Sequence, residues 1–219
     1  MRQIAVLGLS RFGSSVARSL TSMGVEVLGV DSDPEKVADL VHDITHVVQA
    51  DILDNDALDS LGLRNFDAVV LSIKDVEISC LATIAIKDHG AAYVVAQAGA
   101  EPHAKILQRI GADKVIMPEK DMGIRLARSL AGENIIDYME LSARHSLMEI
   151  EALEEWVGRT IKENNIRNRY GINVVAIRSG KALRVSPTGD ELVHDGDLMV
   201  VIGDNDDLEK LQKMGRKKK

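Results

Sequence analysis

A short glycine-rich segment near the start of the chain has the residue types and spacing that bind phosphate groups. Residues 8–13 read Gly-Leu-Ser-Arg-Phe-Gly, which is the pattern G-x-G-x-x-G with a serine at the middle glycine. The first glycine of this pattern allows a tight turn, and the third lets the following helix pack closely on the preceding strand. Backbone N–H groups at the helix start attract anions. The segment predicts a nucleotide-phosphate site in which Ser10 replaces the glycine that normally allows close approach of a pyrophosphate.

Two basic side chains are candidates for contacts with phosphate oxygens. Arg11 lies inside the glycine-rich segment, where a guanidinium can hold phosphate oxygens through two parallel hydrogen bonds. An arginine here suits a terminal β- or γ-phosphate as well as a pyrophosphate bridge. Lys74 follows the fourth expected strand and could add a second positive charge, although a solvated loop lysine is an equally good interpretation.

Two aspartates follow apolar runs that we interpret as strands. Asp31 comes eighteen residues after Gly13, where a carboxylate can accept hydrogen bonds from both ribose hydroxyls. Ser32 and Asp33 come next instead of an arginine, which disfavours a 2′-phosphate and therefore NADP. Asp51 ends the third expected strand and could reach an adenine amino group. The alternative is that both aspartates only cap the helices that follow them.

These residues require a particular set of elements to position them. The first ~130 residues alternate nearly continuous apolar runs with patterns of helical period, which predicts a parallel sheet covered on both faces. The fold class is thus α/β, a Rossmann-like doubly wound parallel sheet. The expected strands are residues 4–8, 25–31, 45–50, 68–72, 93–97 and 114–117. The residues expected at the nucleotide site are Gly8, Ser10, Arg11, Phe12, Gly13, Asp31, Ser32, Asp51, Ile52, Ile73 and Lys74.

The pattern changes in the last third of the chain, where short strands alternate with turn residues such as those of 187–189 and 195–197. We therefore expect a nucleotide-binding domain over residues 1–136 and a smaller α+β domain over residues 137–219.

Composition excludes several classes of function. The net charge of −7 and the pI near 5.4 argue against nucleic acid as a partner, because a phosphate backbone requires a basic face. A DNA-binding redox repressor would also need a basic helix-turn-helix module, which the sequence lacks. No catalytic Ser/His/Asp or Cys/His set and no zinc spacing is recognisable. We therefore expect a protein that senses a nucleotide and is not an enzyme, with a small NAD-dependent oxidoreductase or NAD(H)-binding redox sensor as the alternative.

Several segments together resemble one protein family, the cytoplasmic regulatory subunits of bacterial Ktr/Trk-type potassium uptake systems, which are built of RCK domains. The resemblance covers almost the whole chain, and no single segment would be specific alone. The segments are residues 8–13, 61–67 (Leu-Gly-Leu-Arg-Asn-Phe-Asp), 110–113 (Ile-Gly-Ala-Asp), 118–123 (Pro-Glu-Lys-Asp-Met-Gly), 166–177 and 195–198.

The resemblance implies a function and a set of partners. Such proteins form homodimers that assemble into an octameric ring beneath a membrane-embedded potassium-translocating subunit, at the inner face of the cell membrane. ATP or ADP in the Rossmann cleft changes the shape of the ring. Arg11 matches the arginine near the terminal phosphate, and Asp31 and Asp51 match the ribose and adenine contacts. Glu119 matches a carboxylate that helps to bind a divalent cation, Mg or Ca, between subunits; a plain role at a helix start is the alternative.

The resemblance also implies a second ligand, and the chain departs from the family at several points. Related subunits bind cyclic di-AMP at the dimer interface of the C-terminal domain. Lys162 stands where an apolar residue is usual, and a lysine usual near the end of the fifth strand is absent, with Gln97 in that region. Lys74 would supply the missing charge, and NAD(H) remains an alternative nucleotide. The positions that match the cyclic di-AMP site are Ile161, Asn165, Arg167, Ile172, Asn173 and Pro187.

Overall fold

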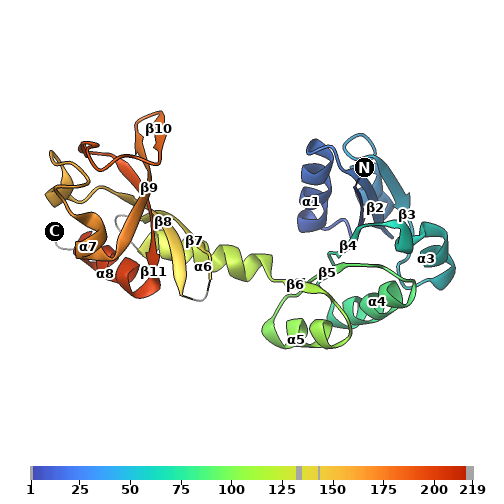
Figure 1. The fold of residues 1–219 in the computed structure, drawn as a ribbon. Helices are drawn as coiled ribbons and strands as arrows, with labels where there is room; N and C mark the ends of the chain where they lie inside the picture. Colours follow the sequence, from blue (N-terminus) through green and yellow to red (C-terminus); the bar gives the residue numbers. More distant parts are fainter. Residues whose placement is uncertain (1, 132–134, 143, 216–219) are drawn as a thin grey trace. The chain divides into compact units, whose positions relative to one another are not determined.

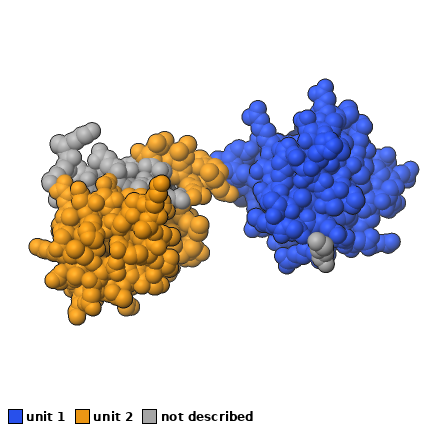
Figure 2. Space-filling model, turned by 90° about the horizontal axis from the view of Figure 1, so that it is seen from above, with its two compact units in different colours: residues 1–119 blue, residues 120–219 orange. Residues whose placement is uncertain are grey.

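The protein consists of two compact units, residues 1–119 and 120–219 (Figure 2). A computed structural model describes residues 2–131, 135–142 and 144–215. Each unit has its own sheet and its own apolar core, as the sequence predicts (Figure 1).

The first unit is an alternation of strands and helices. Its strands are β1 (Gln3–Leu7), β2 (Glu26–Asp31), β3 (His46–Gln49), β4 (Ala68–Leu71), β5 (Val94–Gln97) and β6 (Lys114–Ile116). Its helices are α1 (Arg11–Ser22), α2 (Pro34–Ala38), α3 (Asn55–Leu61), the short 3-10 helix η1 (Leu63–Asn65), α4 (Val76–Asp88) and α5 (Glu101–Arg109). Each of these strands lies close to its expected position.

The six strands form one parallel sheet in the order β3-β2-β1-β4-β5-β6. The order reverses direction at β1, because the chain first adds strands on one side of it and then on the other. Leu7 pairs with Val30 on β2 and with Leu71 on β4, so the carboxyl ends of these three strands lie at the same edge. Ligands of doubly wound sheets bind at such a switch point. The doubly wound α/β fold that the sequence predicts is confirmed.

Apolar clusters cover both faces of this sheet. Successive residues of β1 point to opposite faces, so Val6 packs with Ala17 of α1 on one face, whereas Leu7 packs with Leu58 of α3 on the other. Helices α4 and α5 cover the same face as α3, through residues such as Ile86. This burial on both sides explains why the strand sequences are nearly continuous apolar runs.

The glycine-rich segment brings α1 into close contact with the sheet. Gly8 has φ +90°, and a Cβ there would lie 2.6 Å from the carbonyl oxygen of Ser72. A Cβ at Gly13 would lie 2.1 Å from the carbonyl oxygen of Gly8. Neither position has room for a side chain, so both glycines are required for the packing of α1 against β1 and β4.

The second unit contains an antiparallel sheet in the order β10-β9-β11-β8-β7, with helices packed against it. Trp156, Ile166 and Ile177 are fully enclosed in its core. The α+β class expected for this part is confirmed. Its strands are β7 (Ile135–Glu140), β8 (His145–Glu151), β9 (Ile172–Ser179), β10 (Ala182–Val185) and β11 (Leu198–Asp204). Its helices are α6 (Pro118–Ala131), the 3-10 helix η2 (Glu154–Trp156), α7 (Ile166–Tyr170) and α8 (Asn205–Gly215).

The division between the two units lies after Glu119, earlier in the chain than the predicted domain boundary. The predicted boundary after residue 136 would leave α6 (Pro118–Ala131) in the first domain. Contacts within the structure assign all of α6 after Glu119 to the second unit. As a division into folding domains, the boundary between residues 136 and 137 stays a prediction.

Among the residues that the structure describes, no helix combines the length and the apolar character needed to cross a membrane.

Candidate functional site

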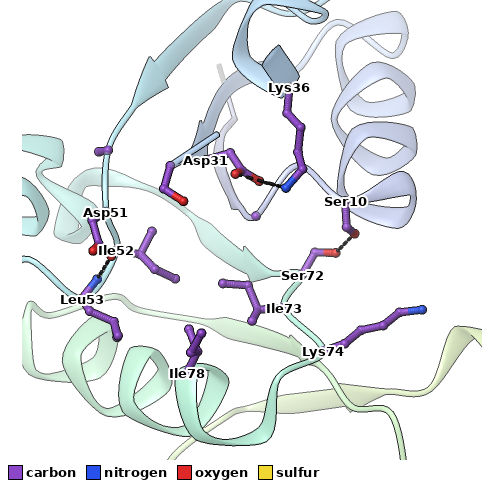
Figure 3. A pocket seen from close by; sticks show the side chains of 13 residues that line it. Ser10, Asp31, Lys36, Asp51, Ile52, Leu53, Ser72, Ile73, Lys74 and Ile78 are labelled. Carbon is purple, nitrogen blue, oxygen red and sulfur yellow. Dashed lines mark hydrogen bonds and ion pairs between the residues drawn. The ribbon is translucent and has the colours of Figure 1, made fainter. Parts of the chain in front are cut away.

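A cavity of about 500 Å³ lies at the carboxyl edge of the parallel sheet, at the switch point between β1 and β4 (Figure 3). Its walls come from the segments that follow β1, β2, β3 and β4, together with α2 and the start of α4. The lining residues are Gly8, Ser10, Asp31, Ser32, Lys36, Ala50, Asp51, Ile52, Leu53, Ser72, Ile73, Lys74 and Ile78.

Most of the residues predicted for the nucleotide site line this cavity. The exceptions are Arg11, Phe12 and Gly13, which form the first turn of α1. The helix α1 begins at Arg11. Arg11 is exposed there, whereas Gly13 is buried against β1. The cavity lining itself therefore contains eight predicted residues: Gly8, Ser10, Asp31, Ser32, Asp51, Ile52, Ile73 and Lys74.

Asp31 holds the glycine-rich turn in place. One carboxylate oxygen, Oδ2, accepts the backbone N–H of Leu9 at 2.7 Å, and Oδ1 accepts the backbone N–H of Asp33 at 2.9 Å. The ammonium of Lys36 lies 3.3 Å from Oδ1 and 3.2 Å from Oδ2 (Figure 3). Asp31 is only 8% exposed, so these contacts compensate the burial of its charge. A ribose diol that binds to this carboxylate would compete with Lys36.

Asp31 and Asp51 do not cap the helices that follow them, which was the alternative interpretation of these two residues. Helix α2 is capped by the side chain of Asp33, and α3 is capped by the side chain of Asp54. Asp51 instead accepts the backbone N–H of Leu53 at 2.9 Å, at the rim of the cavity. Neither Asp31 nor Asp51 caps a helix. Asp31 holds the glycine-rich turn through the N–H of Leu9, and both carboxylates line the cavity.

Ser10 fits the position of the middle glycine without strain. Its φ of −64° is accessible to any residue, and it forms the N-cap of α1 by accepting the backbone N–H of Gly13 at 3.3 Å. Its hydroxyl also lies 2.7 Å from the hydroxyl of Ser72, across the junction of β1 and β4 (Figure 3). The free N–H groups and the dipole at the start of α1 make this end of the cavity attractive to anions.

A line of polar side chains extends from Ser72 to the start of α6. The Ser72 hydroxyl donates to Oε1 of Gln97 at 2.9 Å, and Nε2 of Gln97 contacts both carboxylate oxygens of Glu119 at 3.4 Å. Glu119 forms an ion pair with Lys74, with Nζ and Oε1 2.6 Å apart. Ser72 and Gln97 are 2% and 1% exposed, so they are buried polar groups with defined partners.

Five lining residues were missed by the sequence analysis, and three of them are apolar. Lys36 could have been found from the pattern, because it lies on the first turn of α2, five residues after Asp31. Ser72 carried no local signal, since a serine at the end of an apolar run also fits an ordinary loop. The missed residues are Lys36, Ala50, Leu53, Ser72 and Ile78.

Glu119 carries a negative charge but does not form a metal centre by itself. The Lys74 ammonium and the backbone N–H at the helix start lower the pKa of Glu119. In the described part of the chain, no group of three or more His, Cys, Asp or Glu side chains is arranged to hold a metal ion. A divalent cation that bound this carboxylate would compete with the Lys74 ammonium.

The positions predicted for cyclic di-AMP lie in the second unit and differ in exposure. Asn165, which has φ +49°, and Arg167 are exposed at the start of α7, and Asn173 is exposed on β9. Ile161 and Pro187 are half-buried. Ile172 is fully enclosed in the core, so its side chain has no surface to offer a ligand.

Comparison with known proteins places both units in described families. Residues 4–118 match the TrkA-N domain, and residues 147–214 match the TrkA-C domain. The Ktr system potassium uptake protein C of Bacillus subtilis (strain 168) is 40% identical over 213 residues, covering 97% of this chain and 96% of that protein. The Ktr system potassium uptake protein A of the same organism is 36% identical over 215 residues, with 98% and 97% covered.

Solved structures with a similar fold include the RCK domain of GsuK and the GsuK channel bound to NAD. Both superpose with a TM-score of 0.70 at 17% identity and cover 100% of this chain. This chain spans 48% of the first and 40% of the second. At this identity the likeness establishes the RCK fold alone.

Proposed function

The chain belongs to the TrkA-N and TrkA-C domain family that includes the Ktr system potassium uptake proteins, and from this we propose that it is the nucleotide-binding regulatory subunit of a membrane potassium transporter. It would act without catalysis, by changing shape when ATP replaces ADP. Its partners would be a membrane-embedded potassium-translocating subunit and further copies of itself, in an octameric ring at the inner face of the membrane. A ligand can drive such a change only by binding one state more tightly than the other.

The observation that carries the nucleotide proposal is the cavity between the start of α1 and Asp31. Its anion-attracting end and its buried carboxylate lie at the two places where a nucleotide presents phosphates and a ribose diol. Asp51 at the opposite rim is available to an adenine amino group. Arg11 begins α1 beside the cavity, so its long side chain is suited to reach a terminal phosphate.

Thermal unfolding with ATP, ADP, NAD or NADH tests this proposal, because a ligand that binds only the folded state raises the unfolding midpoint. We expect ATP and ADP to raise the midpoint and NAD to leave it unchanged. A shift with NADH alone would favour an NAD(H)-binding redox sensor, which the cavity would also suit through the same ribose contact. No shift with any of the four would refute nucleotide binding.

A divalent cation between subunits is a further part of the proposal. Glu119 would supply one ligand, and the phosphates or a second copy would supply the others. Because Lys74 lies 2.6 Å from this carboxylate, the cation would release Lys74 toward the cavity. Replacing Glu119 by Gln should abolish any increase in ATP affinity caused by Ca²⁺ or Mg²⁺, measured by calorimetry.

Cyclic di-AMP is the proposed second ligand, with Arg167 facing a phosphate and Asn173 facing a base. Both side chains are exposed on the second unit. Titration calorimetry of the full chain should give binding heat that Arg167→Ala removes. The control is Arg144→Ala, an arginine of the same unit whose side chain is 81% exposed and pairs with Asp204. Absence of heat with the unmodified chain would refute this part of the proposal.

A further inference from the structure

The buried hydroxyl of Ser72 and the buried amide of Gln97 connect Ser10 at the phosphate end of the cavity with Glu119 at the start of α6. The successive heavy-atom distances are 2.7 Å from Ser10 to Ser72, 2.9 Å from Ser72 to Gln97 and 3.4 Å from Gln97 to Glu119. Burying a hydroxyl and an amide among apolar residues is costly unless their hydrogen bonds are made. The hydrogen bonds of Ser72 and Gln97 are therefore complete only while the two side chains contact each other, Ser10 and Glu119.

The charge of Glu119 sets the direction of every hydrogen bond in this line. A carboxylate only accepts hydrogen bonds, so Gln97 turns its NH₂ toward Glu119 and its oxygen toward Ser72. Ser72 has a single proton and gives it to Gln97. It must then accept a hydrogen bond from Ser10, whose own proton is used for this contact.

When the hydrogen bonds run in this direction, the Ser10 hydroxyl can only accept hydrogen bonds from a ligand in the cavity. A phosphate oxygen that approaches the start of α1 would meet an acceptor there and not a donor. If the amide of Gln97 turned over, its NH₂ would donate to Ser72, Ser72 would donate to Ser10, and Ser10 would donate to the phosphate. The amide oxygen would then face the Glu119 carboxylate, which repels it. The negative charge at Glu119 thus opposes the direction that favours phosphate.

We propose that Ser72 and Gln97 are positioning residues that make the phosphate affinity of Ser10 depend on the state of Glu119. The inference rests on the proposed nucleotide function and adds a route by which events at the start of α6 reach the nucleotide. Neutralising Glu119 releases the Gln97 amide, and the reversed line turns the Ser10 hydroxyl into a phosphate donor.

Calorimetric titration with ADP in the presence of EDTA tests the inference in the full chain. Ser72→Ala removes the acceptor that holds the Ser10 proton, so this truncation should tighten ADP binding about fivefold, the worth of one net hydrogen bond. The gain should disappear in Ser10→Ala/Ser72→Ala. A residue with a merely structural role would weaken binding or leave it unchanged when truncated.

A double-mutant cycle supplies the second readout. Glu119→Gln should tighten ADP binding in both backgrounds, because it removes a negative charge, but about fivefold more when Ser72 is present. The matched control is Ser79→Ala, a fully buried serine of α4 outside the cavity, which should lower the unfolding midpoint without changing ADP affinity.

The outcomes separate this inference from the function on which it rests. If the unmodified chain binds no ADP, both the proposed function and the inference are overturned. If ADP binds, but Ser72→Ala weakens its binding or leaves it unchanged, or Glu119→Gln has the same effect in both backgrounds, only the inference is overturned.

Discussion

At the scale of single residues, Arg11 is the side chain most suited to distinguish ATP from ADP. It begins α1 at the anion-attracting end of the cavity and is exposed. We expect Arg11→Ala to weaken ATP binding about tenfold, as expected for loss of a charge-assisted hydrogen bond, and ADP binding less. Calorimetry with both nucleotides measures the difference. Arg18→Ala on the same helix, where the arginine pairs with Asp43 at 2.6 Å, is the control. Equal losses for ATP and ADP would show that Arg11 does not meet the terminal phosphate.

The buried imidazole of His103 should make stability depend on pH. Its Nδ1 accepts the backbone N–H of Gly99, so Nε2 carries the proton and donates to Ser79. Burial lowers the pKa of His103, and the nearby Asp75 only partly offsets this effect. Below about pH 6.5, His103 becomes protonated in the unfolded chain but stays neutral in the folded protein. The free energy of unfolding therefore falls as the pH decreases toward the lowered pKa of His103 in the folded protein.

Denaturant unfolding of the unmodified chain and of His103→Gln between pH 7.5 and pH 5.5 checks this expectation. The free energy of unfolding should fall with decreasing pH more steeply in the unmodified chain. The carboxylates whose pKa is lowered, such as Asp113, lose their contribution only at more acidic pH. Identical pH profiles for the two proteins would contradict the assignment to His103.

At the scale of elements, helix α1 can lie close to the sheet only because Gly13 has no side chain. Gly13→Ala would place a Cβ 2.1 Å from the Gly8 carbonyl oxygen, so α1 would have to move away from β1. We expect a loss of about 3 kcal/mol in the free energy of unfolding, the upper end for overpacking, and loss of nucleotide binding. Chemical denaturation measures the first effect.

A glycine of another helix provides the contrast. Gly123 lies within α6, and a Cβ there would meet nothing within 4 Å in the described structure. Gly123→Ala should therefore be neutral or stabilise the protein by about 0.5–1 kcal/mol, because alanine loses less backbone entropy in a helix. Similar losses for both substitutions would show that the packing of α1 is not the cause.

At the scale of the whole molecule, the two cores should respond separately to their ligands. The chain has a single tryptophan, Trp156, which is fully buried in the second unit and packs edge-on against Tyr170 at 5.3 Å between ring centroids. Tryptophan fluorescence therefore reports unfolding of that unit. We expect ADP to slow hydrogen exchange within residues 2–119 and to leave the fluorescence midpoint unchanged, since the proposed nucleotide cavity is lined by residues of the first unit alone.

Cyclic di-AMP is expected to have the opposite effect, raising the fluorescence midpoint of Trp156 while exchange within residues 2–119 stays the same. Each measurement is the control for the other ligand. Equal stabilisation of both units by either ligand would mean that they unfold as one cooperative body.

Local sequence patterns predicted the alternation of strands and helices, the glycine-rich turn, and the place of Asp31 at the end of the second strand. These features are local, because apolar period, capping residues and the spacing of glycines are written within a few residues of each element. Asp33 before Pro34, for example, is a capping residue followed by a proline, and α2 begins at this point. The same local pattern left open whether Asp31 and Asp51 cap helices.

The residues that complete the cavity from distant parts of the chain could be identified only from the folded arrangement of the strands. Ser72 and Gln97 lie far from Ser10 in the chain, and the strand order β1-β4-β5 brings them into one hydrogen-bonded line. The ion pair between Lys74 and Glu119 arises in the same way. Such contacts depend on how parallel strands pair across crossover helices, and no local period of the sequence specifies that pairing.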